Sequence, residues 1–138
     1  MEIKLKETKS KQTKESSIDE FISYLMVCRN VLHAMHLKVT GIGSYASHKA
    51  LNTFYEDIGE FIDFLTEQHQ GATGKLINCI EVPYKKLNTI EETISYLKEI
   101  KNCCTEIQKN ISFSEIVNTI DELKSKINLT LYKLIFLK

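Results

Sequence analysis

The stretch HLKVTGIGSYASHKALNTFYEDIGEFIDFLTE, residues 36–67, gathers the chemically versatile side chains of this chain in one regular pattern. It indicates the end of one helix, a turn around the GIG at 41–43, and a second long helix over roughly 44–69. At about 100° per residue, four polar side chains of that helix share one side, and its apolar side chains repeat on another. The polar four are His48, Asn52, Asp63 and Glu67, and the apolar set is Leu51, Phe54, Ile58, Ile62 and Leu65. The helix therefore has one face for a core and one for a polar partner.

The polar face cannot form a single site inside one chain. His48 and Glu67 are nineteen residues apart, which is about 28 Å along a helix. The midpoints of the pairs His48/Glu67 and Asn52/Asp63 both fall between residues 57 and 58. An antiparallel copy related by a twofold axis there would place His48 opposite Glu67 of the second copy, as isologous dimers do. We therefore predict a homo-oligomer built through this helix, with Gly59 near the axis letting the two helices approach closely.

The spacing of these residues resembles the Dps family, the DNA-binding miniferritins of the ferritin-like superfamily. That family has a His near the end of the first helix and a Gly-containing turn. A second His comes twelve residues after the first, an Asp four later, another Asp eleven after that, and a Glu four further on. This chain matches the register without a gap, at His36, Gly41, His48, Asn52, Asp63 and Glu67. The match covers roughly residues 25–74, and beyond it only the helical layout agrees.

The resemblance implies a di-iron ferroxidase site across a twofold interface. His36, His48, Asp63 and Glu67 would be its catalytic residues, and Asn52 would join them as a metal ligand. Imidazole and carboxylate ligands suit iron, and zinc is the alternative metal. The family precedent also implies a dodecameric shell that stores iron, uses peroxide as the oxidant and protects DNA. The leading hypothesis is thus a divergent Dps-like miniferritin.

Two positions depart from the family pattern. Asn52 stands where the family has Asp, which removes one anionic ligand per site, and Leu37 stands where it usually has Trp. A second hypothesis is therefore a non-enzymatic Dps-like shell or DNA-coating protein, for instance viral or phage-borne, with a degenerate ferroxidase centre. A third is a plain helical interaction module in which the His spacing is fortuitous. His33, one turn before His36, is either a surface or core-edge residue or a residue that supports the ligands of the metal site.

Composition bounds the alternatives. The 138 residues suit one domain, and 18 Lys and Arg balance 18 Asp and Glu, so no global field attracts nucleic acid. The four Cys form no CxxC pair and fit reduced thiols. No apolar run is long enough to span a membrane. Phosphate-loop, nucleophile-elbow and HExxH motifs are missing. We expect a cytoplasmic or nucleoid-associated protein without a membrane partner.

The N-terminal residues 1–16 form a Lys-rich segment. It is either a solvated, disordered tail or an arm that contacts DNA, because each phosphate contact adds to a salt-dependent affinity. The candidate DNA-binding residues are Lys4, Lys6, Lys9, Lys11 and Lys14.

Residues 17–138 are predicted to form an all-α, ferritin-like four-helix bundle with a long crossover between the second and third helices. Capping-box patterns mark helix starts at Ser17 and Thr89, and a fourth helix opens at Ser112–Glu115. The crossover, which contains Pro83, could carry a short helix over 76–80. The last turns, residues 129–138, are apolar nearly all round. They could belong to the core of the monomer or to a subunit contact, and we favour the subunit contact.

Overall fold

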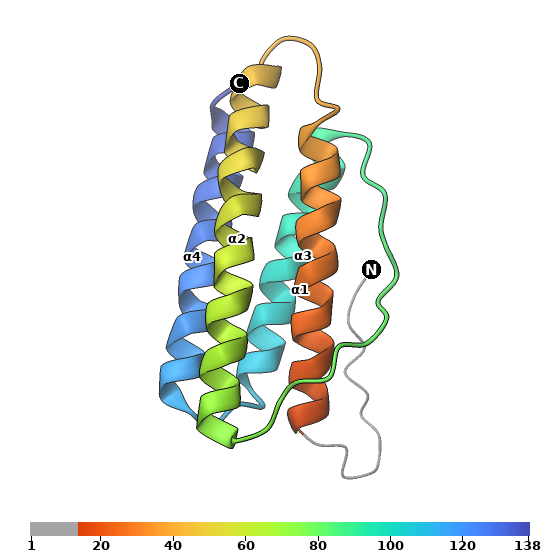
Figure 1. Ribbon diagram of the computed structural model, residues 1–138. Helices are drawn as coiled ribbons and strands as arrows, with labels where there is room; N and C mark the ends of the chain where they lie inside the picture. The colour runs from red at the N-terminus through yellow and green to blue at the C-terminus, as the bar shows by residue number, and fades with distance from the viewer. Residues whose placement is uncertain (1–13) are drawn as a thin grey trace.

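The computed structural model describes residues 14–138, which form a four-helix bundle (Figure 1). Its helices are α1 (Lys14–His36), α2 (Ser44–Thr73), α3 (Ile90–Gln108) and α4 (Ser114–Phe136). Within residues 14–138 there is no strand. The predicted all-α four-helix architecture is therefore confirmed, including the long crossover between α2 and α3.

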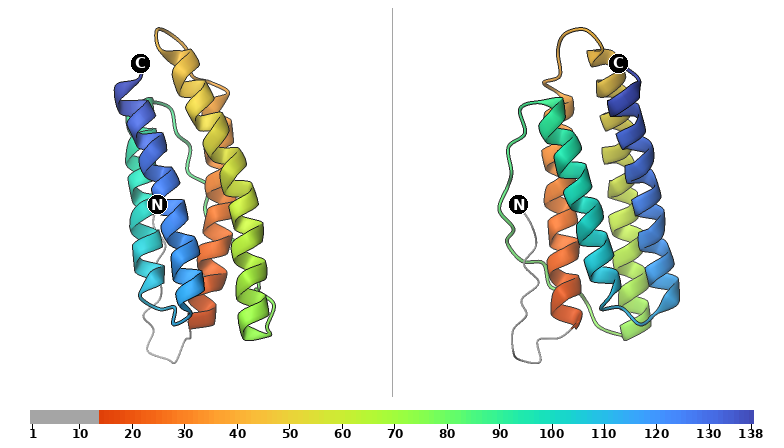
Figure 2. Two further views of the ribbon diagram at one scale, coloured as in Figure 1. Left: turned by 90° about the vertical axis from the view of Figure 1, so that its left-hand side faces the viewer. Right: turned by 180° about the vertical axis from the view of Figure 1, so that it is seen from behind.

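The bundle is a square in which each helix is antiparallel to both of its neighbours. The packed pairs are α1 with α2, α2 with α4, α4 with α3, and α3 with α1. Figures 1 and 2 show that α2 and α3 run in the same direction, so the chain must return along the full length of the bundle between them. By contrast, α1 and α2 are joined by a short turn at one end of the bundle, and His36 and His48 lie near this turn.

The crossover is an extended segment that lies beside α1 (Figure 1). The backbone N–H of Asn78 donates to the Asp19 carboxylate at 3.0 Å, and that of Ile80 donates to the Ser23 hydroxyl at 2.9 Å. The prediction of a short helix at 76–80 is wrong. The N–H groups of Asn78 and Ile80 are taken by side chains of α1, and the N–H of Ile77 donates to Gln70 Oε1 of α2 at 3.0 Å, so these donors do not bond to carbonyls of their own segment.

The helix starts agree only in part with the predicted caps. At α3 the capping box is confirmed: the Thr89 hydroxyl accepts from the Glu92 N–H at 3.0 Å, and the Glu92 carboxylate accepts from the Thr89 N–H at 3.2 Å. At α1 the predicted cap is wrong, because the helix begins at Lys14 and Ser17 lies inside it. At α4 the N-cap is Phe113, which makes no side-chain capping bond. The C-terminal end of α2 also differs from the prediction, because this helix runs to Thr73, four residues beyond the predicted end.

The core is formed by the inward stripes of all four helices. Each predicted apolar residue of α2 is at most 5% exposed, which confirms the core face expected from the sequence. Burying a side chain of this size contributes roughly 1.5–3 kcal/mol. The largest fully buried side chains include Phe21, Tyr24 and Leu32 of α1, Leu51, Phe54 and Leu65 of α2, and Tyr96 and Leu97 of α3.

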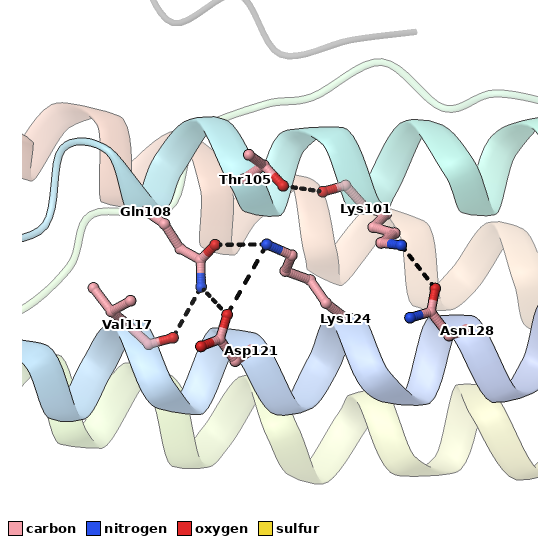
Figure 3. A network of polar contacts seen from close by, with 7 residues as sticks. All are labelled: Lys101, Thr105, Gln108, Val117, Asp121, Lys124 and Asn128. Atoms are coloured by element: carbon pink, nitrogen blue, oxygen red, sulfur yellow. Dashed lines mark hydrogen bonds and ion pairs between the residues drawn. The ribbon is translucent and has the colours of Figure 1, made fainter.

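A polar network joins α3 to α4 (Figure 3). The Gln108 carboxamide donates to the Val117 carbonyl at 2.9 Å and to the Asp121 carboxylate at 2.8 Å, and it accepts from Lys124 Nζ at 2.9 Å. All the bonding capacity of the amide nitrogen is used within the chain. The network therefore holds α3 against α4, and the Gln108 amide nitrogen has no donor left for a ligand.

The C-terminal part of α4 exposes large apolar side chains. Leu129 is 58% exposed, Tyr132 53% and Phe136 69%. The expected role of this stretch as a subunit contact stays a prediction. In the described part of the chain, no helix combines the length and the apolarity that crossing a bilayer requires.

Candidate functional site

The turn between α1 and α2 folds the start of α2 back over the end of α1. The Lys38 N–H donates to the Met35 carbonyl at 3.0 Å, and the Ser44 N–H donates to the Gly41 carbonyl at 3.1 Å. Gly43 has φ 83°, a left-handed conformation that costs little only at glycine. As a result His48, on the second turn of α2, lies against His36 at the last turn of α1.

The imidazole rings of His36 and His48 are stacked. Their centroids are 4.0 Å apart and the ring planes differ by 24°. His48 Nδ1 lies 3.0 Å from the His36 carbonyl oxygen, and His36 Nδ1 lies 3.2 Å from the His33 carbonyl oxygen. A carbonyl only accepts, so Nδ1 of each ring carries the hydrogen at this contact, and in that neutral tautomer Nε2 has the lone pair. Histidines that ligate metals use this arrangement, with the second nitrogen held by a carbonyl.

Two further rings complete the cluster. The His33 ring stacks on Tyr55 with centroids 4.2 Å apart and planes 13° apart. The rings of His36 and Tyr55 meet in a T-shaped contact, with their centroids 5.0 Å apart. His33 is half-buried, and its ring centroid lies 5.6 Å from that of His36. This fits the core-edge position expected for it, while a role in supporting a metal site stays a prediction. Tyr55 was not predicted from the sequence, although its position two turns after His48 places it on the same side of α2.

The surroundings of His36 favour its neutral form. Its side chain is 5% exposed, and burial lowers its pKa below the ordinary value of 6.5. The hydrogen bond to the His33 carbonyl opposes this shift, whereas the nearby His48 and His33 rings lower the pKa further. A neutral imidazole is the form that binds a metal, because its lone pair is free.

Of the other predicted ligands, the two carboxylates lie apart from the imidazoles. Asn52 is half-buried one turn after His48, while Asp63 and Glu67 are exposed on the outer side of α2. Asp63 is fifteen residues from His48, about 22 Å along the helix. In residues 14–138 no group of three or more His, Cys, Asp or Glu side chains is placed to hold a metal ion. One chain therefore brings together His36 and His48 but not the four predicted catalytic residues.

Between the His cluster and Asp63, an open groove of about 640 Å³ runs along α1 and α2. Arg29 lies in it, with Nε donating to the Tyr55 carbonyl at 3.2 Å. A Cβ on Gly59 would come within 2.7 Å of Arg29 Nε. Gly59 thus makes room for a side chain of its own chain, a role that differs from the predicted clearance for a second helix. The other lining residues are Met26, Asn30, Glu56, Glu60, Ile62 and Asp63.

The candidate DNA-binding lysines are outside this site. Lys4, Lys6, Lys9 and Lys11 lie outside the described residues, and Lys14 is the first residue of α1. The expectation of a DNA-contacting arm stays a prediction.

Comparison with known proteins finds relatives that carry no functional assignment. Residues 36–134 match the model of a family of unknown function, DUF5856. The chain is also 29% identical over 114 residues to an uncharacterized 14.6 kDa protein from the mobD–ri intergenic region of Enterobacteria phage T4. That alignment covers 83% of this chain and 84% of the phage protein. No solved structure matches the chain significantly.

Proposed function

The chain belongs to DUF5856, whose function is unknown, and we propose that it is a Dps-like miniferritin that binds iron between two copies of the chain. The observation that carries this proposal is the paired His36 and His48, each with Nδ1 at a backbone carbonyl. Both Nε2 atoms are then free to bind a cation.

The remaining ligands come from the second copy. Asp63 and Glu67 are too far along α2 to reach the imidazoles of their own chain, and both are exposed. An antiparallel second α2, related by the twofold axis near residues 57–58, brings them to the His pair of its partner. Each dimer then has two identical sites.

The two metal positions of such a site differ in strength. The first is formed by His36 with Asp63 and Glu67 of the second copy, and it combines one imidazole with two anionic oxygens. The second relies on His48 and Asn52, whose amide offers one carbonyl oxygen but no charge. Iron is the substrate, and zinc is the alternative metal. We therefore expect one tightly bound metal per site and slow oxidation of ferrous iron.

The DNA part of the proposal depends on the Lys-rich N-terminal residues. Removing residues 1–13 leaves the start of α1 intact. In the full-length chain at low salt we expect retarded migration of DNA on a gel, and the shortened chain should lose it while keeping its oligomeric mass. If the full-length chain does not retard DNA, this part of the proposal is excluded.

A second candidate function is an assembly module without metal chemistry. It is favoured by the burial of His36, which is 5% exposed and packed between His48 and Tyr55. Buried aromatic stacks of this kind stabilise a helix junction by about 0.5–1.5 kcal/mol per pair. In this case the four rings would fix the α1–α2 turn and leave no ligand for a cation.

Cation titration separates the two candidates. Calorimetry with Zn²⁺ and anaerobic Fe²⁺ should show about one tight equivalent per chain for the wild type. His36→Gln and Glu67→Gln should each lose it, because each change removes a ligand of the stronger position. Glu122→Gln is the matched control, since Glu122 is exposed on α4. Absence of binding to the wild type would leave the assembly module as the better account.

A further inference from the structure

The face of the molecule formed by α1 and α2 carries an excess of negative charge. Its outer row on α2 has four exposed carboxylates. Two basic groups lie beside this row, Arg29 in the groove and the exposed Lys49, so the row and these two groups together carry a net charge of −2. The four carboxylates belong to Glu56, Glu60, Asp63 and Glu67. The whole chain is neutral by formal charge, so this face differs from the rest of the molecule.

Arg29 lies beside carboxylates of its own chain but forms no ion pair with them among the residues that the structure describes. It is the single Arg of the chain, and its aliphatic stem and Nε pack against Gly59. Its Nε donates to the Tyr55 carbonyl. Among the ion pairs formed within residues 14–138, none includes Arg29, Glu56 or Glu60. The guanidinium therefore sits in a groove beside carboxylates with its charge uncompensated by a direct pair.

We infer that a second copy closes this groove and that divalent cations switch the closure on. The inference rests on the proposed function, because it uses the same twofold pairing of α2. Two copies face to face bring together a net charge of −4, and such like-charge contact opposes association. Two divalent cations, one at each His site, cancel that charge. The Arg29 of each copy neutralises part of the carboxylate row near the axis, where residues 55–59 of the two helices cross.

Charge therefore favours a second copy as the occupant of the groove, and it favours that copy only when cations are bound. Without cations, the two acidic rows repel each other and the chain stays monomeric. With cations bound, each groove presents an Arg29 to the acidic row of the other copy, and charge-assisted hydrogen bonds can form across the interface. Glu56 and Glu60 are not ligands in the proposed site, so their effect on assembly can be separated from metal binding.

The test measures the mass of the full chain by light scattering, in EDTA and in a series of Zn²⁺ and Mn²⁺ concentrations. For the wild type we expect a monomer in EDTA and at least a doubling of mass when cations are added. Glu56→Gln/Glu60→Gln should assemble at roughly tenfold lower cation concentration, or in EDTA, because the repulsion is reduced. Arg29→Met should require about tenfold more cation, since it keeps the aliphatic stem and removes the charge. The control Asp121→Asn/Glu122→Gln, on α4, should behave as the wild type, and circular dichroism should show all variants folded.

Three outcomes overturn the inference in distinguishable ways. If the wild type assembles equally in EDTA while cation binding still depends on His36 and Glu67, the switch is wrong and the proposed function stands. If no cation binds under any condition, the proposed function falls together with the switch. A wild type that binds cations but stays monomeric contradicts the second copy as the occupant of the groove.

Discussion

His36 and His48 stack with their ring centroids 4.0 Å apart, although a turn and the start of a new helix separate them in the chain. Each ring uses Nδ1 to hold a backbone carbonyl, so the pair is oriented by the main chain. The contact therefore depends on the backbone of the α1–α2 turn, because hydrogen bonds to the main chain hold both rings in place. This is the kind of support that a metal ligand needs to keep its geometry.

Asn52→Asp should strengthen the second metal position. Asn52 is half-buried one turn after His48, and an Asp there adds an anionic oxygen to a site that has only an amide. We expect the second equivalent of Zn²⁺ to bind about tenfold more tightly or better, and ferrous oxidation to become faster. Calorimetry and the absorbance of ferric iron measure the two effects.

The matched control for this change is Asn118→Asp, on the exposed side of α4. It adds the same charge far from the His pair and should leave both metal binding and oxidation unchanged. Equal behaviour of Asn52→Asp and Asn118→Asp would contradict the assignment of Asn52 to the second position.

The fold was predictable because the apolar stripes of all four helices agree with one architecture. Leu51, Ile58 and Leu65 repeat at helical spacing, and all are fully buried. The extended crossover was harder to predict. Its backbone is held by Asp19 and Ser23, which lie 57 or more residues earlier in the sequence. Local propensity carries no information about such long-range bonds.

The candidate site was predictable only as a set of positions. The spacing of His36 and His48 indicates that both lie near the turn, and the structure brings them together. The contacts of Tyr55 and Arg29 with this region depend on how α1 packs on α2, which a single-helix pattern does not specify. For the same reason the sequence assigned Gly59 to an intermolecular contact, whereas its space is used by Arg29.

Thr89→Ala should destabilise the bundle by about 1 kcal/mol, because it removes the side-chain acceptor of the α3 capping box. Ser112→Ala is the control at a similar sequence pattern, since α4 uses Phe113 as its N-cap without a side-chain bond. It should change the free energy of unfolding by less than about 0.5 kcal/mol. Urea denaturation measures both, and equal losses would show that the capping box is not the cause.

Thiol reactivity should distinguish Cys79 from the other cysteines. Cys79 is exposed in the crossover, whereas Cys28, Cys103 and Cys104 are buried. Burial raises the pKa of Cys28 to about 12, despite the hydrogen bond from the Tyr96 hydroxyl, and burial also raises the pKa of Cys104. With an aromatic disulfide reagent at pH 8 we expect one fast-reacting thiol per chain, and none in Cys79→Ser.

The raised pKa of Cys28 also sets the sign of the alkaline pH dependence. The unfolded chain loses this proton near the ordinary value of 9.0, whereas the folded chain keeps it to about 12. The stabilisation is therefore complete below pH 9 and is lost as the pH rises toward 12. The urea midpoint should be lower at pH 10 than at pH 8, and this fall should be smaller in Cys28→Ala. An equal fall in that variant would exclude Cys28 as a contributor.

The most direct test of the shared site is to mix two variants that are each defective. One carries His36→Gln/His48→Gln and the other Asp63→Asn/Glu67→Gln, and neither alone should bind the metal tightly. If the ligands come from two copies, a mixed pair regains one intact site of its two. Equal, random mixing then restores about one quarter of the wild-type Zn²⁺ capacity. Recovery near that level is the result that we predict, and an absence of recovery, with both variants folded and exchanging partners, would contradict a site shared between copies.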